Sequence, residues 1–225
     1  MIMENKKIET QNQINSNNKN SSVDKIHLFY SNNIRENAAK TIIKKISQLL
    51  EDICDENTKN FKENNRGENS NIKPFLSKNI PQISIKDYLE RLYKHTKINC
   101  STIILILIYI DRICNIQKFK LTYFNIHKLI LASMIIANKF NEEEQYTTKF
   151  YSKLGGVPIA EITFLEYNFF FLLNFNLFVK DDLYKKYSDY ISSADSEEDE
   201  YENDNWKEED EYGEKNTEKD NINNE

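Results

Sequence analysis

Glycine and proline are scarce in this chain, since 225 residues hold only four glycines and three prolines. A sheet protein needs turn residues at short intervals, and a doubly wound α/β fold needs glycine-rich loops. The composition argues against both classes and favours helices.

Cysteine and histidine are also few, and neither is arranged for a disulfide scaffold or a metal site. Cys54, Cys100 and Cys114 lie far apart without a Cys-x-x-Cys pair, and the three histidines are not spaced as metal ligands. This pattern favours a reducing compartment, so we expect the protein in the cytoplasm, the nucleus or both. We expect no metal and no cofactor.

The chain lacks a long apolar run. The longest, residues 103–110, has eight residues, well short of the roughly 20 that cross a bilayer. The N-terminus has no apolar signal region. We therefore expect neither a membrane span nor a signal peptide, and no membrane partner.

The two ends are unlike the middle. Residues 1–24 are mainly polar, and residues 192–225 carry 15 acidic and three basic side chains. The tail therefore has a charge of −12, and since the whole chain has −6, the remainder has +6. Neither end can bury a core, so both are predicted to be disordered. A specific role for the acidic tail, in covering the basic body or binding a partner, stays open.

An amphipathic helix is predicted before the main domain. Over residues 35–53 the apolar side chains recur with a helical period, and charged side chains fill the other face. We assign residues 25–54 to an N-terminal helical extension and the Asn- and Glu-rich residues 55–79 to a flexible linker.

Five more helices are predicted in residues 80–179, which makes the fold all-α. Ser84 and Asn125 are candidate N-caps of the first and third. Gly155 and Gly156 stop the fourth, and Pro158 opens the fifth. The predicted helices cover residues 85–96, 102–115, 126–140, a short stretch to 154, and 158–173. The second is apolar all round, which is typical of a helix in the middle of a bundle. Residues 180–191 are assigned to a short extension.

Two of the apolar stretches each carry one conspicuous ion. These are Lys139 in LILASMIIANKF, residues 129–140, and Glu166 in GGVPIAEITFLEYNFFFLLNFNLFV, residues 155–179. An unpaired ion in apolar surroundings costs on the order of several kcal/mol or loses its charge. The two ions are therefore predicted to form a paired site or to belong to a docking face.

Three segments, in order and at matching spacing, resemble the cyclin box, most closely that of the P/U-type cyclins of phosphate signalling. They are YLERLYKHTKINCSTIILILIYIDRI (residues 88–113), LILASMIIANKF, and KFYSKLGGVPIAEITFLEYNFF (residues 149–170). The resemblance spans about residues 80–179 and implies a single five-helix box. It also implies a regulatory subunit that binds a cyclin-dependent protein kinase and sets its C-helix and activation loop, while the kinase transfers the phosphoryl group.

The resemblance further implies a kinase-binding surface. Lys139 and Glu166 match the pair with which cyclins hold the kinase near its C-helix, and Glu143 resembles an acidic stand-in for the activation-loop phosphate. The residues implied to contact the kinase are Lys139, Phe140, Glu143, Glu166, Phe170, Phe175 and Leu177.

Each of these assignments has a plainer alternative. Lys139 can pair internally with Glu166, the phenylalanines can be core residues, and Glu143 can be a solvated turn charge. However, residues 169–171 are three consecutive phenylalanines, which cannot all face inwards on one helix. At least one aromatic side chain is therefore expected to be exposed or covered by a partner. Asp111 is expected to hold a neighbouring helix through hydrogen bonds.

Other function classes are less well supported. The double glycine is not followed by the Lys-Ser/Thr of a phosphate loop, so an enzyme of its own is not expected. The basic residues are scattered, which argues against nucleic acid as a partner. The alternatives to an activating cyclin are a non-activating helical adaptor and a transcription-related cyclin-box protein.

Overall fold

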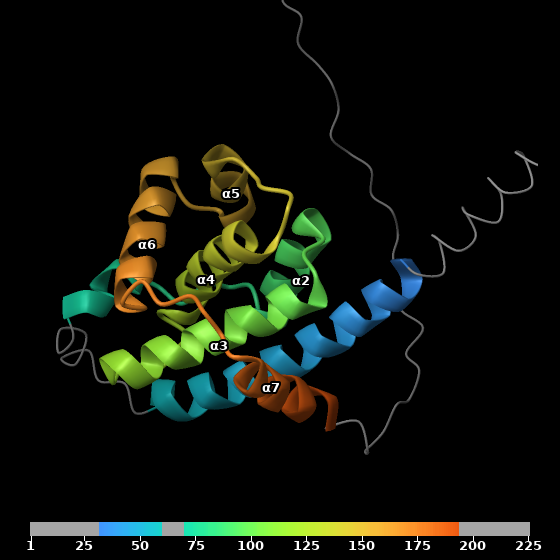
Figure 1. Ribbon diagram of the computed structural model, residues 1–225. Helices are drawn as coiled ribbons and strands as arrows, with labels where there is room; N and C mark the ends of the chain where they lie inside the picture. The colour runs from blue at the N-terminus through green and yellow to red at the C-terminus, as the bar shows by residue number, and fades with distance from the viewer. Residues whose placement is uncertain (1–31, 60–69, 194–225) are drawn as a thin grey trace, which may run out of the picture. The chain divides into compact units, whose positions relative to one another are not determined.

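The computed structural model describes residues 32–59 and 70–193, and every regular element within these ranges is a helix (Figure 1). Residues 32–59 are helical, and the later elements are η2 (Ser70–Phe75), α2 (Ile85–Thr96), α3 (Cys100–Gln117), α4 (Ile126–Asn141), α5 (Thr148–Gly155), α6 (Ile159–Leu172) and α7 (Asp181–Ser193). The prediction of an all-α fold is confirmed. The predicted disordered end 1–24 and nearly all of the acidic tail lie outside the described residues.

Helix α3 is the centre of the fold. It packs against α4, α6 and α7, and ten of its 18 residues are buried. Figure 1 shows α4, α5 and α6 on one side of α3, and the helix of residues 32–59 with α7 on the other. Within the described ranges, α3 alone is long and apolar enough to cross a bilayer. Its burial identifies it as the predicted core helix.

The start of α2 is set by its cap. The Ser84 hydroxyl oxygen accepts a 3.0 Å hydrogen bond from the Asp87 backbone N–H, so one of the N-terminal donors of the helix is satisfied. The side chains also join, since Ser84 Oγ donates to Asp87 Oδ2 at 2.7 Å. The predicted first helix of the box is confirmed.

Asn125 does not cap α4 in the predicted way. It precedes the helix, but its side chain makes no cap hydrogen bond. Its Oδ1 instead accepts from the Thr122 backbone N–H at 3.0 Å, and its Nδ2 donates to the Lys120 carbonyl at 3.0 Å. The amide therefore holds the preceding turn, a role that an Asn side chain fills as readily as a cap.

The two glycines at the end of α5 have different roles. Gly156 is the C-cap with φ +69°, the left-handed conformation that favours glycine, and so ends the helix. Gly155 is the last residue of the helix and is favoured by packing, because a Cβ there would clash with Leu131 Cδ2 of α4.

The helix of residues 32–59 is fixed to the box near both of its described ends. Arg35 Nη2 donates to the Lys97 carbonyl at 2.9 Å, and Tyr123 donates from its hydroxyl to Asp55 Oδ1 at 3.0 Å. Ile43, Ile46 and Leu50 are buried on its inner face. The amphipathic helix is confirmed, and it continues past the predicted end at residue 53.

Part of the predicted linker, residues 55–79, is regular structure. Residues 55–59 continue the helix, and η2 covers Ser70–Phe75. Phe75 is fully buried, and its ring meets that of Phe169 edge-on at 6.1 Å. Burying such a side chain contributes about 1.5–3 kcal/mol, which explains why this segment packs on the box.

The predicted short extension, residues 180–191, is the helix α7. Ile191 is buried, and the Tyr187 hydroxyl donates to Asp111 Oδ2 at 2.7 Å. The expectation that Asp111 holds a neighbouring helix is confirmed, although the helix it holds was not foreseen. Apolar side chains at residues 183, 184, 187, 190 and 191 have helical spacing, so the signal was present in the sequence.

Candidate protein-binding site

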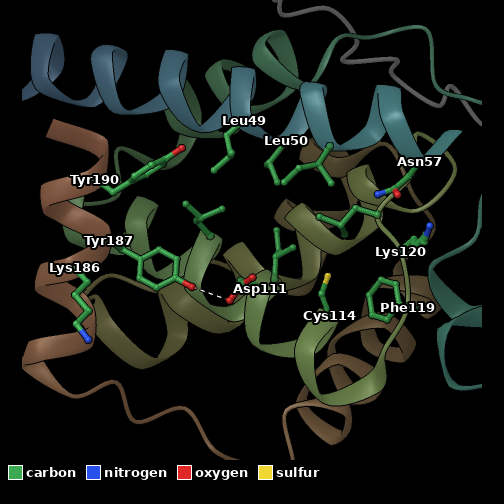
Figure 2. Close-up of a pocket in the computed structure, with 14 residues that line it drawn as sticks. Leu49, Leu50, Asn57, Asp111, Cys114, Phe119, Lys120, Lys186, Tyr187 and Tyr190 are labelled. Atoms are coloured by element: carbon green, nitrogen blue, oxygen red, sulfur yellow. Dashed lines mark hydrogen bonds between the residues drawn. The ribbon is translucent and has the colours of Figure 1, made fainter. Parts of the chain in front are cut away.

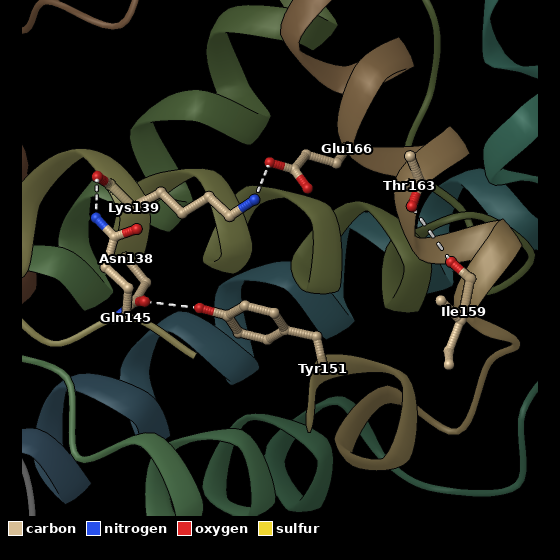
Figure 3. Close-up of polar contacts among 7 residues, drawn as sticks. All are labelled: Asn138, Lys139, Gln145, Tyr151, Ile159, Thr163 and Glu166. Atoms are coloured by element: carbon tan, nitrogen blue, oxygen red, sulfur yellow. Dashed lines mark hydrogen bonds and ion pairs between the residues drawn. The ribbon is translucent and has the colours of Figure 1, made fainter. Parts of the chain in front are cut away.

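Lys139 and Glu166 come together across two helices. Lys139 lies in the last turn of α4, and Glu166 lies in the middle of α6. Their Nζ and Oε1 atoms are 2.5 Å apart, and the side chains are 37% and 25% exposed (Figure 3). The internal ion pair therefore forms, yet both partners remain accessible from solvent.

One buried and one exposed polar contact fix the end of α4 that carries Lys139. Asn138 is 1% exposed, and its Oδ1 accepts a 2.6 Å hydrogen bond from the Tyr151 hydroxyl of α5. Burial raises the pKa of Tyr151, so the hydroxyl keeps its proton and remains a donor. Gln145 Nε2 donates to the Lys139 carbonyl at 3.1 Å (Figure 3). Lys139 thus projects from a rigid helix end, where the helix dipole also favours a cation.

A groove of about 500 Å³ surrounds the ion pair. Its lining comes from α4, α6 and the segment that follows α6, and consists of Ile136, Lys139, Phe140, Thr163, Glu166, Tyr167, Phe170 and Leu177. Five of the seven residues predicted to contact a kinase are in this lining. The structure therefore brings most of the predicted site to one place.

Phe175 lies beside the groove rather than in its lining. Its ring meets that of Phe170 at 4.9 Å and 87°, and it is 57% exposed. Asn174 and Phe175 both have positive φ, 51° and 59°, so the chain turns sharply after α6.

Glu143 does not belong to the groove. It is exposed in the turn after α4 and lines no part of the hollow. The carboxylate that makes contacts in this turn is that of the neighbouring residue, Glu142. It accepts hydrogen bonds from the Asn99 backbone N–H at 2.7 Å, from Asn99 Nδ2 at 2.6 Å and from the Thr102 hydroxyl. Glu142 thus places a negative charge at the positive N-terminal end of α3.

The three consecutive phenylalanines divide as expected. Phe169 is fully buried, Phe170 is half-buried in the groove, and Phe171 is 52% exposed. Sequence reasoning missed the other exposed aromatic side chains of α6, Phe164 and Tyr167. The sequence feature that could have found them is that α6 is apolar around its whole circumference, so apolar side chains must also face away from the core.

The Tyr-Ile-Asp-Arg element of α3 supports the wall of the groove. The Tyr109 hydroxyl donates to the Leu177 carbonyl at 2.9 Å, and Arg112 donates to the carbonyls of Asn176 and Phe178 at 2.6 and 3.1 Å. Three consecutive carbonyls of an irregular segment are thereby satisfied. Leu177 is held in the groove by these bonds.

A second hollow of about 400 Å³ lies between the helix of residues 32–59, α3 and α7 (Figure 2). Its walls are mostly apolar, and Figure 2 shows the hydrogen bond between the Tyr187 hydroxyl and Asp111 within it. Burial raises the pKa of Cys54 and Cys114 to about 12, so these thiols are poor nucleophiles. Among the described residues no group of three or more His, Cys, Asp or Glu could hold a metal.

A family profile and several known proteins are similar to this chain, and all of them are described as cyclins or cyclin-like. The family profile described as Cyclin matches residues 4–177. Cyclin-U2-1 of Arabidopsis thaliana is 30% identical over 159 residues, which cover 70% of this chain and 71% of that protein. PHO85 cyclin-like protein psl1 of Schizosaccharomyces pombe is 37% identical over 121 residues, 53% of this chain and 50% of that protein. PHO85 cyclin-7 of Saccharomyces cerevisiae is 31% identical over 132 residues, 53% of this chain and 46% of that protein.

Proposed function

The chain belongs to the cyclin family, and we propose that it binds and activates a cyclin-dependent protein kinase through the groove between α4 and α6. The observation that carries the proposal is the gathering of Lys139, Glu166, Phe140, Phe170 and Leu177 around one groove. The resemblance to the cyclin box implies these same residues as kinase contacts. One relative is named a PHO85 cyclin and another a PHO85 cyclin-like protein, which supports a cyclin-dependent kinase as the partner.

The Lys139–Glu166 ion pair can open so that each side chain binds a charged group of the kinase instead. Lys139 and Glu166 are 37% and 25% exposed, and ion pairs of partly exposed side chains contribute only about 0–1 kcal/mol. Opening the pair to meet charged groups of a kinase helix therefore costs little. The pair also keeps both charges satisfied while no kinase is bound.

Exposed aromatic side chains supply the binding energy. Phe140 and Phe175 are 56% and 57% exposed, and both lose water when a partner covers them. Buried aromatic anchors are the usual hot spots of protein interfaces. The ion pair accordingly sets orientation, and the phenylalanines set affinity.

The mechanism is allosteric. Binding energy at the groove selects the kinase conformer in which the C-helix and the activation loop are correctly placed. The kinase then transfers the phosphoryl group, and the cyclin contributes no reacting group. Glu143 is exposed in the turn after α4, where it is free to meet arginines of the activation loop.

The test uses the full chain co-expressed with each cyclin-dependent kinase of its source organism and with PHO85. Binding is measured by titration, and activation by kinase turnover. We expect at least one kinase to bind and to be activated. Failure of the whole panel would remove the proposal.

Two other functions give different outcomes in the same experiment. A helical adaptor would bind a kinase without raising its turnover. A transcription-related cyclin-box protein would bind no kinase in the panel and would bind DNA in a strongly salt-dependent way. We propose the cytoplasm, the nucleus or both as the location, since three dispersed cysteines without a Cys-x-x-Cys pair fit a reducing compartment.

A further inference from the structure

Helix α6 carries a second apolar surface that adjoins the groove. It consists of Phe164, Tyr167 and Phe171, which are 54%, 67% and 52% exposed. Positions i, i+3 and i+7 lie on one face of a helix. The core of the protein takes the opposite face, with Ile162, Leu165 and Phe169 buried. We call Phe164, Tyr167 and Phe171 the outer strip.

The outer strip has no free charge beside it on α6. The carboxylates of this helix are both engaged: Glu161 lies 2.8 Å from Lys128 Nζ, and Glu166 is paired with Lys139. A solvent-facing helix ordinarily carries charged side chains on such a face. A run of exposed aromatic side chains without them marks an interaction surface.

The outer strip and the groove are continuous. Tyr167 belongs to both, since it also lines the groove. The Phe175 ring lies 4.9 Å from that of Phe170 in the groove and 6.2 Å from that of Phe171 in the strip. Protein interfaces end at a polar rim, whereas the aromatic side chains of Tyr167 and Phe175 join these two surfaces.

The groove alone is too small for a stable interface. Eight residues line it, whereas a partner of standard size contacts about 20–30 residues on each side. A protein seated in the groove must therefore extend beyond it. Tyr167 and Phe175 provide an aromatic connection from the groove to the outer strip.

We propose that the kinase that fills the groove also covers the outer strip with a second apolar segment, so that α6 lies between two parts of the same partner. The inference rests on the proposed function and adds Phe164 and Phe171 to the binding surface. A partner that covers only the groove would leave the side chains of Phe164 and Phe171 exposed to water.

The test compares two variants of the full chain against a kinase that binds the wild type. In the first, Phe164→Ser and Phe171→Ser are combined. The control is Tyr190→Ser on α7, an aromatic side chain of similar exposure, 60%, on a different helix. We expect the double variant to bind roughly 30-fold more weakly, since each interface side chain that matters to affinity changes it by about fivefold or more, and the control to stay within about twofold. Thermal unfolding followed by circular dichroism should show no loss of stability in either variant, because both replace exposed side chains.

Other results would overturn the inference in distinguishable ways. The double variant could bind the kinase within about twofold of wild type while variants of the ion pair lose binding. That result would refute kinase contact with the outer strip and would leave the proposed function intact. Analytical ultracentrifugation could instead show a dimeric wild type and a monomeric double variant, with the kinase affinity unchanged. That result would show that the outer strip binds a second copy of the chain. No binding of any kinase by the wild type removes both proposals.

Discussion

Tyr109 and Leu177 are 68 residues apart in sequence, and a 2.9 Å hydrogen bond joins the hydroxyl of one to the carbonyl of the other. Tyr109 lies in the central helix α3 and is fully buried, whereas Leu177 lines the groove. The bond connects the core of the protein directly to the wall of its candidate binding site.

Removing this bond should weaken both the fold and the site. Tyr109→Phe keeps the ring and leaves the Leu177 carbonyl without its donor, which we expect to cost about 0.5–1.5 kcal/mol of unfolding free energy. Urea unfolding measures the loss, and amide hydrogen exchange over residues 176–178 should become faster. Tyr190→Phe is the control, because Tyr190 is 60% exposed and lies on a different helix, α7. An unchanged exchange rate in Tyr109→Phe would show that the two Arg112 contacts suffice.

Gly155 should resist substitution for steric reasons. The Cβ of Gly155→Ala would clash with Leu131 Cδ2. The Leu131 side chain is fully buried, so it has little room to move away. We expect a loss of about 1–3 kcal/mol of unfolding free energy. In a Leu131→Val background the same substitution should cost less, because the clashing methyl group is withdrawn. Equal costs in both backgrounds, measured as a double-mutant cycle, would refute the clash.

The two neighbouring glutamates should behave differently. Glu142→Ala removes the acceptor of three hydrogen bonds at the start of α3, so we expect a loss of about 1–3 kcal/mol of stability. Glu143→Ala should change stability by less than about 0.5 kcal/mol, as an exposed turn position does. If Glu143 meets kinase arginines, its variant should bind the kinase but activate it less. Normal activation by Glu143→Ala would leave it as a solvated turn charge.

Stability should fall at alkaline pH. Burial raises the pKa of Cys54 and Cys114 from 9.0 to about 12, so above pH 9 the unfolded chain releases these protons before the folded protein does. Stability from these groups is present in full below pH 9 and is lost as the pH rises towards 12. Urea unfolding at pH 7, 9 and 10 should show the decline. A variant with Cys54→Ala and Cys114→Ala should show a shallower one, and an identical decline would assign it to other groups.

The box was predictable because its signals are local. Ser84 with Asp87 marks the start of α2, Gly156 marks the end of α5, and the apolar residues of α3 identify a core helix. Each depends on side chains within a few residues of the feature. The pairing of Lys139 with Glu166 was one of two outcomes predicted from their apolar surroundings, whereas the inclusion of Phe140 in the same site came from the resemblance.

The parts that could not be predicted depend on distant contacts. Residues 55–79 look like a polar linker, but Phe75 is buried against Phe169, almost 100 positions later. Asn125 had the identity and position of a cap, yet a competing turn takes its side chain. The identity of a residue fixes what it can bond, and the tertiary fold decides which partner it meets.

The Lys139–Glu166 pair is central to the proposed interface, and exchanging the two charges tests its role most directly. The double variant Lys139→Glu, Glu166→Lys keeps opposite charges facing each other across α4 and α6, so an internal pair can still form. Its affinity for a kinase that binds the wild type is measured by titration, with thermal unfolding as the check on folding. We predict near wild-type stability with kinase binding weakened at least about tenfold, because the partner meets both charges reversed. Wild-type affinity and activation in this variant would show that the pair serves only the fold, and would contradict the proposed interface.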